Sequence, residues 1–259
     1  QLIADAVAAA KNADVVLFFG GLNKASHQDC EDSDRYHLEL PYAQDKVIEA
    51  LAEANPNLAV VIISGNAVAM PWVDKVNAIV EGWYSGSQMG HAIADVLFGK
   101  VNPSGKLPFT FPVKLEDNGA HALNAYDPQD LTVEYKEDIY VGYRWADKQQ
   151  IKPLFAFGHG LSYSTFKYKR ARLSKGVLRI PVKNVSRRDG DEVVQVYVKR
   201  ADDPEGPIMS LRGFKRVSVK AKKKAVVEIP MSADNLDLFN PETGKMEAAP
   251  GKYIVYYGG

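Results

Sequence analysis

The chain has 259 residues, of which 46% are hydrophobic, and its 32 basic residues balance its 32 acidic ones. This length is sufficient for two ordinary cores. The absence of net charge argues against a nucleic-acid partner, because nucleic-acid-binding domains carry a basic face. No stretch approaches the roughly twenty apolar residues of a membrane span, so we expect a soluble chain. Cys30 is the only cysteine, which excludes an internal disulfide framework and leaves the compartment open.

The first half of the chain alternates between helical and strand patterns. The predicted elements are helices over Gln1–Lys11, Pro41–Ala54 and Met89–Phe98, and strands over Val15–Phe19, Leu58–Ile63 and Ala78–Val80. The first helix lacks a basic leader and a cleavage site, so we interpret it as the continuation of something longer and not as a signal peptide. Pro41 suits the first position of the second helix, and Gly99 ends the third. Strands that alternate with helices predict a mostly parallel sheet.

The second half changes to the shorter period of strands. Strands are predicted over Val177–Lys183, Val193–Lys199, Arg216–Val219, Ala225–Met231 and Tyr253–Tyr257. Gly, Pro, Asp and Asn turns separate them, and short strands without helices are typical of an antiparallel sandwich. We interpret the basic run Lys220–Lys224 as a solvated hairpin turn between two of these strands.

These patterns predict an α/β domain followed by an all-β domain. We place an α/β sandwich with a mostly parallel sheet over residues 1–111 and a β-sandwich over residues 166–259. Residues 112–165 lie between them and are rich in aromatic side chains and proline. That stretch is too aromatic for a flexible linker, so we expect it to pack across the domain boundary.

The loop after the first strand, from His27 to Arg35, carries the strongest chemical signal. Its carboxylates are Asp29, Glu31, Asp32 and Asp34. Ligands of open α/β sheets bind outside the carboxyl ends of the strands, where this loop emerges. Crowded carboxylates raise one another's proton affinity, so one of them could donate a proton near neutral pH, while Arg35 would keep its partner ionised. A solvated acidic loop is the alternative.

Other chemistries fit the sequence less well. Cys30 and His27 lack a third orienting residue, which a thiol nucleophile and its base would need. Gly99–Lys106 differs from a phosphate-binding loop in spacing, and it lacks the Ser or Thr that holds magnesium. The remaining histidines, His37, His91, His121 and His159, show no metal-ligand spacing. We therefore expect no cofactor and no metal. Asn184 begins a formal glycosylation sequon, a triplet that is common by chance.

A series of short motifs carries a resemblance to a known family. The motifs are Gly21–Asn23, Glu31–Arg35, Leu38–Pro41 with Gln44, Ser64–Asn66, Trp83–Gly86, Ala92–Gly99, Asn102–Pro108, Tyr140–Trp145, Pro153–Phe155 and Phe157–Tyr163. In this order they resemble the second domain of family 3 glycoside hydrolases, the β-glucosidase and β-xylosidase family. The resemblance implies an α/β sandwich followed by a fibronectin type III-like domain. It also implies an N-terminal barrel domain, absent here, that supplies the nucleophilic aspartate.

The resemblance further implies a function and a site. Alignment of the Glu-x-x-Asp-Arg pattern assigns Glu31 as the general acid/base of a retaining, exo-acting β-glycosidase, most simply a β-glucosidase acting on β-linked glucosides or oligosaccharides. Asp34 and Arg35 would form a supporting ion pair. Many members carry glycine directly after the glutamate, so Asp32 departs from the pattern, and Asp29 or Asp32 could compete with Glu31. The family suggests a periplasmic or secreted protein. A non-catalytic carbohydrate-binding or structural module, or an adhesin built on residues 166–259, remains as an alternative.

Overall fold

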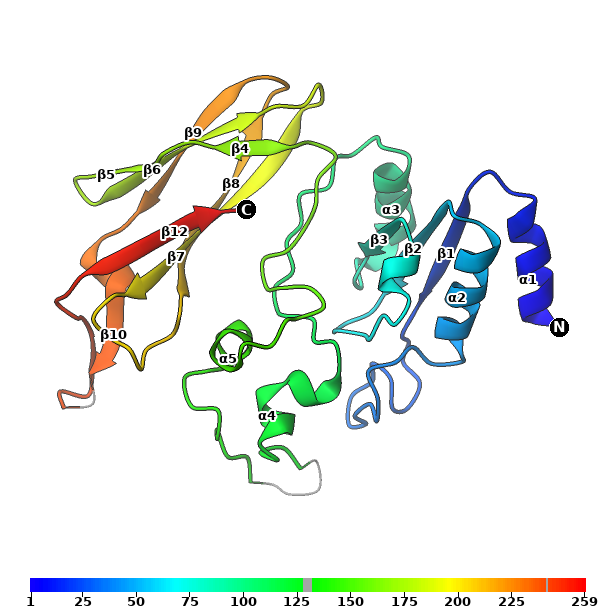
Figure 1. Cartoon of the computed structure of the whole chain (residues 1–259), viewed down its shortest axis with the longest axis horizontal. Coiled ribbons are helices and arrows are strands. Elements are labelled where there is room, and N and C mark those ends of the chain that lie inside the picture. The colour runs from blue at the N-terminus through cyan, green and yellow to red at the C-terminus, as the bar shows by residue number, and fades with distance from the viewer. Residues whose placement is uncertain (128–131, 241) are drawn as a thin grey trace. The chain divides into compact units, whose positions relative to one another are not determined.

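The computed structural model of the chain describes residues 1–127, 132–240 and 242–259 (Figure 1). The chain divides into two compact units. The first unit combines Gln1–Asp95 with Phe111–Lys136, and the second combines Val96–Thr110 with Glu137–Gly259. The domain boundaries predicted at residues 111 and 165 stay predictions.

A three-stranded parallel sheet forms the centre of the first unit. Its strands are β1 (Val16–Gly21), β2 (Leu58–Ile63) and β3 (Ala78–Glu81), in the order β1-β2-β3. The central strand β2 is the most apolar of the three, and Val60, Val61 and Ile62 are fully buried. A strand buried on both faces is typical of a parallel sheet, so the fold class predicted for this half is confirmed.

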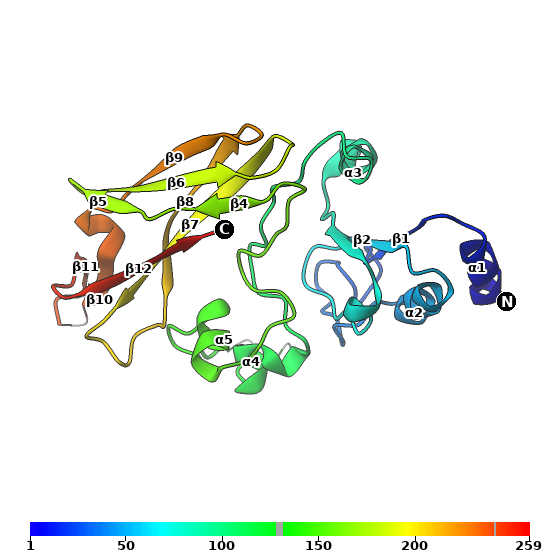
Figure 2. The ribbon, with the colours of Figure 1, turned by 45° about the horizontal axis from the view of Figure 1, so that its top comes forward.

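The long helices of the chain are α1 (Leu2–Lys11), α2 (Gln44–Ala54) and α3 (Met89–Leu97). Helices α1 and α2 lie side by side in both views (Figures 1 and 2). The side chain of Asn55, directly after α2, donates hydrogen bonds to the carbonyl oxygens of Ala10 (2.9 Å) and Ala13 (2.7 Å). The first bond adds a partner to a carbonyl group at the end of α1, and the second holds the residues that follow the helix.

The predicted start of the second helix was wrong. Pro41 is not its first residue, because Tyr42 and Ala43 adopt left-handed backbone angles, with φ of 59° and 57°, and α2 begins only at Gln44. The side chain of Gln44, the first residue of α2, joins the helix to the end of β1. Its Oε1 accepts a hydrogen bond from the backbone N–H of Gly21 (2.8 Å), and its Nε2 donates to the carbonyl oxygen of the same residue (2.9 Å).

Several short helices are too brief to show a helical period, and the sequence did not predict them. They are α4 (Gly119–Ala122), α5 (Tyr143–Gln149) and the 3₁₀ turns η1 (Val73–Lys75), η2 (Gly86–Gln88), η3 (Leu115–Asp117) and η4 (Ala233–Leu236). An amphipathic period becomes recognisable only over about eleven residues or more.

The second unit contains an antiparallel β-sandwich. In one sheet β6 (Val177–Asn184) pairs with β4 (Phe166–Tyr168), β5 (Arg172–Ser174) and β9 (Lys224–Pro230). In the other sheet β7 (Gly190–Arg200) pairs with β8 (Ser210–Val219) and β12 (Tyr253–Gly258). β10 (Asp237–Asn240) and β11 (Lys245–Ala248) form a separate hairpin. The predicted sandwich is confirmed, although the sequence missed β4, β5, β10 and β11.

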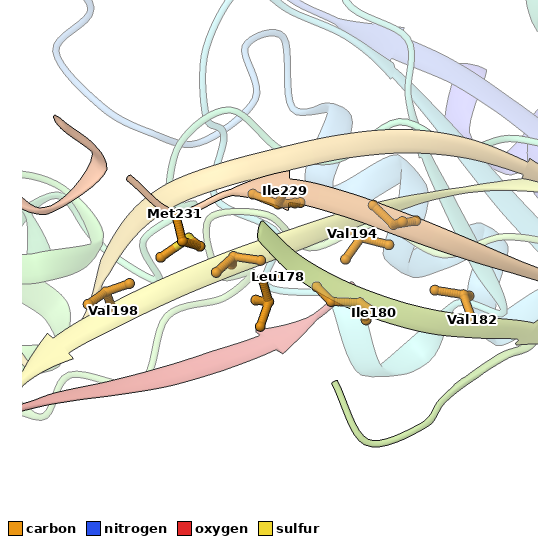
Figure 3. Packing of buried hydrophobic residues seen from close by; sticks show 9 residues of the cluster. Leu178, Ile180, Val182, Val194, Val198, Ile229 and Met231 are labelled. Atoms are coloured by element: carbon orange, nitrogen blue, oxygen red, sulfur yellow. The ribbon is translucent and has the colours of Figure 1, made fainter. Parts of the chain in front are cut away.

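Aliphatic side chains from the two sheets fill the sandwich core (Figure 3). Its members are Leu178, Ile180, Val182, Val194, Val196, Val198, Val227, Ile229 and Met231.

The predicted hairpin at Lys220–Lys224 was wrong, because β8 pairs with β7 whereas β9 pairs with β6. That turn therefore carries the chain from one sheet to the other.

Asn102 ties the segment before the sandwich to strands and loops of the second unit. Its Oδ1 accepts hydrogen bonds from the Ser162 hydroxyl (2.9 Å) and the Tyr163 N–H (2.8 Å), and its Nδ2 donates to the Ser164 hydroxyl (2.9 Å) and the Asp189 carbonyl (2.8 Å). All four hydrogen-bonding positions of the amide are therefore used.

Candidate functional site

The ends of the three parallel strands surround one pocket in the first unit. The pocket has a volume of about 430 Å³ and lies against the loops that follow β1, β2 and β3. Its lining residues are Gln28, Asp29, Cys30, Ser33, Asp34, Arg35, His37, Leu38, Gly65, Asn66, Tyr84, Leu115, His121 and Tyr126. The sequence predicted this position for a site, because ligands bind beyond the carboxyl ends of parallel strands.

Asp29 joins all three of these loops. Its carboxylate accepts hydrogen bonds from the N–H of Gly65 (2.6 Å), the Nδ2 of Asn66 (2.8 Å) and the hydroxyl of Tyr84 (2.8 Å). Burial raises the pKa of the Tyr84 hydroxyl above its ordinary value, and the bond to Asp29 raises it further. These three bonds tie Asp29 to the loops after β2 and β3, so Asp29 is suited to hold its own loop in place.

Arg35 and Asp34 hold the same loop through separate partners. The Arg35 guanidinium donates through Nη2 to the carbonyl oxygen of Ala67 (2.6 Å), while Asp34 accepts a hydrogen bond from the hydroxyl of Tyr126. Burial lowers the pKa of Arg35, and the negative charge of Asp29 opposes this effect. Among their described contacts, Asp34 and Arg35 do not form the predicted ion pair with each other. Each side chain bonds to another segment instead.

Glu31 lies at the tip of a tight turn. Cys30 and Ser33 form an isolated antiparallel bridge, which leaves Glu31 and Asp32 as the two residues of the turn between them. Both side chains are exposed, and neither is among the described residues that line the pocket. Asp32 has a φ of 61°, in the left-handed region that glycine adopts without strain. The backbone geometry therefore gives a physical reason for a glycine directly after the glutamate.

His27 stabilises the loop from within. Its ring stacks on that of Tyr36 with a centroid separation of 4.0 Å, and its Nε2 bonds to the Tyr36 hydroxyl (2.8 Å). Its Nδ1 lies 2.9 Å from the Asp34 carbonyl oxygen and 3.1 Å from the Ser33 hydroxyl. Both ring nitrogens have partners inside the loop, as expected of a structural histidine and not of a base for Cys30.

Glu81, at the end of β3, does not line the pocket but interacts electrostatically with the lining residue Asp29, and sequence reasoning missed it. Burial raises its pKa to about 7, while hydrogen bonds from the N–H of Trp83 (3.1 Å) and the hydroxyl of Ser64 (3.3 Å) act in the opposite direction. The negative charge of Asp29 adds to the increase. The available signal was a lone acidic residue that ends an apolar strand, and it was overlooked beside the denser acidic loop.

The site thus contains carboxylates in different environments. Asp29 accepts three hydrogen bonds, Glu81 is half-buried with a pKa of about 7, and Glu31 is exposed on a turn. Such separation of environments is how proteins assign different proton-transfer roles to carboxyl groups.

Residues 1–127, 132–240 and 242–259 contain no candidate metal centre and no candidate membrane-spanning helix. Within these ranges, His, Cys, Asp and Glu side chains form no group of three that could hold a metal ion. No helix in the same part of the chain has the length and apolar character needed to cross a bilayer.

Comparison with known proteins gives consistent matches over nearly the whole chain. Residues 1–163 match the model of the glycosyl hydrolase family 3 C-terminal domain, and residues 192–259 match a fibronectin type III-like domain. The chain is 44% identical over 266 residues to Beta-glucosidase BoGH3A of Bacteroides ovatus, an alignment that covers 97% of this chain and 35% of that protein.

Solved structures agree with this assignment. A beta-glucosidase from Kluyveromyces marxianus in complex with glucose superposes with a TM-score of 0.91 and 36% identity, over 99% of this chain and 31% of that one. The Bifidobacterium adolescentis GH3 beta-glucosidase gives a TM-score of 0.92 and 34% identity, over 99% and 39%. The chain spans about a third of the length of the curated relatives it matches. The chain belongs to glycosyl hydrolase family 3, of which it carries the C-terminal domain followed by a fibronectin type III-like domain.

Proposed function

We propose that this chain is the C-terminal part of a retaining, exo-acting β-glucosidase that hydrolyses terminal non-reducing β-D-glucosyl residues. The names of the relatives support the reaction, since the proteins at 39–44% identity are described as beta-glucosidases. The substrate is then a β-linked glucoside or oligosaccharide, and the partner is an N-terminal barrel domain of the same enzyme.

Glu31 is the proposed general acid/base. The observation that carries this role is its place as an exposed carboxyl group on a turn whose base is anchored to all three strand ends through Asp29. An exposed carboxyl at the tip of a held turn is able to reach into a cavity that another domain provides. Asp34 and Arg35 support the role because their bonds to Tyr126 and Ala67 restrain the loop.

The two chemical steps follow from retaining hydrolysis. An aspartate of the barrel attacks the anomeric carbon while protonated Glu31 gives its proton to the leaving glycosidic oxygen, and a glycosyl-enzyme forms. Ionised Glu31 then takes a proton from water, whose oxygen attacks the same carbon and releases the sugar with retained configuration. The two carboxyl groups must lie about 5–5.5 Å apart, and nothing requires them to come from one domain. Without a barrel, the chain alone would be inactive.

The test is Glu31→Gln in the complete enzyme that contains this chain. Turnover of glucosides with poor leaving groups should fall by about 10²–10⁴-fold, because these substrates need protonation of the departing oxygen. With activated leaving groups the first step should be largely spared, while hydrolysis of the glycosyl-enzyme slows because the general base is lost. Azide should restore part of that second rate, as a nucleophile that needs no general base. Glu39→Gln changes another exposed glutamate of the same loop and is the matched control.

Unchanged kinetics in Glu31→Gln would remove Glu31 from the mechanism. If the complete enzyme itself showed no turnover but bound oligosaccharides, the chain would be part of a carbohydrate-binding module instead.

A further inference from the structure

One face of the β-sandwich in the second unit carries an unusual row of like charges. The face consists of the outward-pointing residues of β4, β5, β6 and β9, and we call it the basic sheet face. Figure 2 shows β5, β6 and β9 side by side in this sheet. Side chains alternate across a strand, and Ile180 and Val182 of β6 point into the core, so Lys183 between Val182 and Asn184 points outward.

Three lysines stand directly opposite one another on this face. Lys167 of β4 is the register partner of Lys183 of β6, and Lys183 is also the partner of Lys224 of β9. Like charges directly opposite on neighbouring strands destabilise a sheet. Among the described ion pairs none involves any of these three ammonium groups. No described ion pair therefore offsets the repulsion among these three ammonium groups.

Further positive charges extend the row. Lys169 donates its backbone N–H to Pro181, which continues the ladder and places its side chain on the same face as Lys167. Arg172 of β5 is the register partner of Arg179. The acidic member of this face is Glu228, which pairs with Arg179 at 2.7 Å. The face thus holds six cationic side chains, Lys167, Lys169, Arg172, Arg179, Lys183 and Lys224, against one acidic side chain.

Two apolar side chains, beside Lys169, lie between the lysine row and the arginine row. Pro181 of β6 and Val226 of β9 are register partners, and Val226 is 58% exposed. No aromatic ring occupies the outward positions of the four strands within the described register. Sites for single-stranded nucleic acids rely on aromatic rings that stack with bases, so this face does not suit them.

We infer that the basic sheet face binds an acidic polysaccharide with one carboxylate on each sugar. Carboxylates complement the lysine and arginine rows, and the apolar faces of the sugar rings fit the apolar side chains of Pro181 and Val226. Adjacent strands lie about 4.8 Å apart, so the ammonium groups of the lysine row repeat at a regular spacing, as the carboxylates of such a polysaccharide do. The inference is independent of the role proposed for Glu31 and requires no catalysis by this chain.

The test measures binding of the full chain to polygalacturonate, with neutral pullulan as the reference polymer. Affinity for polygalacturonate should exceed that for pullulan and fall steeply with salt, since the Debye length shrinks from about 10 Å at 0.1 M to about 3 Å at 1 M. The triple variant Lys167→Gln, Lys183→Gln, Lys224→Gln should bind about tenfold more weakly or worse. The control Lys11→Gln, Lys46→Gln, Lys152→Gln removes the same charge from exposed lysines elsewhere and should bind normally.

A melting experiment distinguishes a loss of binding from a loss of folding. Removing the repulsion should raise the Tm of the first triple variant by about 1–4 °C, so weaker binding cannot be attributed to a lost fold. Equal losses in both triple variants would overturn the inference, as would an absence of binding to polygalacturonate. Tighter binding to duplex DNA or to anionic phospholipid vesicles than to polygalacturonate would also overturn it.

Discussion

The hydroxyl of Tyr84 donates a hydrogen bond to the carboxylate of Asp29 over 2.8 Å, which joins the end of β3 to the loop that follows β1. Together with the bonds from Gly65 and Asn66, it connects that loop to the ends of β2 and β3. Asp29 is two residues from Glu31, so the position of the proposed acid/base depends on these contacts.

Asp29→Asn should therefore lower the free energy of unfolding by about 1–3 kcal/mol, because an amide NH₂ would face donors that now meet a carboxylate oxygen. Tyr84→Phe removes one bond and should lower it by about 1 kcal/mol. Urea denaturation measures both effects, and Asp14→Asn, at an exposed position of the same unit, is the control. Wild-type stability in Asp29→Asn would show that the three bonds do not hold the loop.

Replacement of Asp32 tests the backbone strain of the turn. Because Asp32 has a φ of 61°, Asp32→Gly should keep the turn and raise stability by up to about 1 kcal/mol, whereas Asp32→Val should lower it by about 1–2 kcal/mol. Thermal melting of the two variants gives the comparison. In the complete enzyme, Asp32→Gly should retain turnover. Loss of turnover on poor leaving groups would transfer the proposed acid role from Glu31 to Asp32.

Glu81 makes stability depend on pH in a defined direction. Its folded pKa of about 7 lies above the ordinary value of 4.5, so the folded protein binds this proton more tightly than the unfolded chain does. The associated stability is present below about pH 4.5 and is lost as the pH rises to about 7, by an amount on the order of 2–3 kcal/mol.

Urea denaturation across pH 4–8 measures this effect, and Glu81→Gln should flatten the curve in that window. The exposed Glu53 of α2 is a matched site, so Glu53→Gln should leave the curve unchanged. A Glu81→Gln variant with the same pH dependence as the wild type would contradict the assignment.

Asn102→Ala should destabilise the second unit. The substitution leaves the Tyr163 N–H and the Asp189 carbonyl without their side-chain partner, at an expected cost of about 1–3 kcal/mol. Asn77→Ala, at an exposed position, should change stability by less than about 0.5 kcal/mol. Hydrogen exchange of the Tyr163 amide gives a local measurement, which should accelerate in Asn102→Ala alone.

The sequence by itself determined the elements that have a continuous apolar run or a clear amphipathic pattern. Leu58–Ile63 was predicted with the bounds that the structure gives, because a run of buried β-branched and apolar residues leaves few alternatives. The ordered motifs were sufficient to indicate the family, which the match of residues 1–163 to the family 3 C-terminal domain then showed.

Only the tertiary structure decided the partners of individual side chains. Gln44 at the start of α2 bonds to Gly21, a residue distant in sequence, and the strands β4 and β5 are short segments defined by pairing with β6. The acidic loop contains several carboxylates that look alike in sequence, and their environments differ because Gly65, Asn66 and Tyr84 converge on Asp29 while Glu31 stays exposed. Proton affinity depends on burial and on neighbouring charges, which chain folding alone brings together.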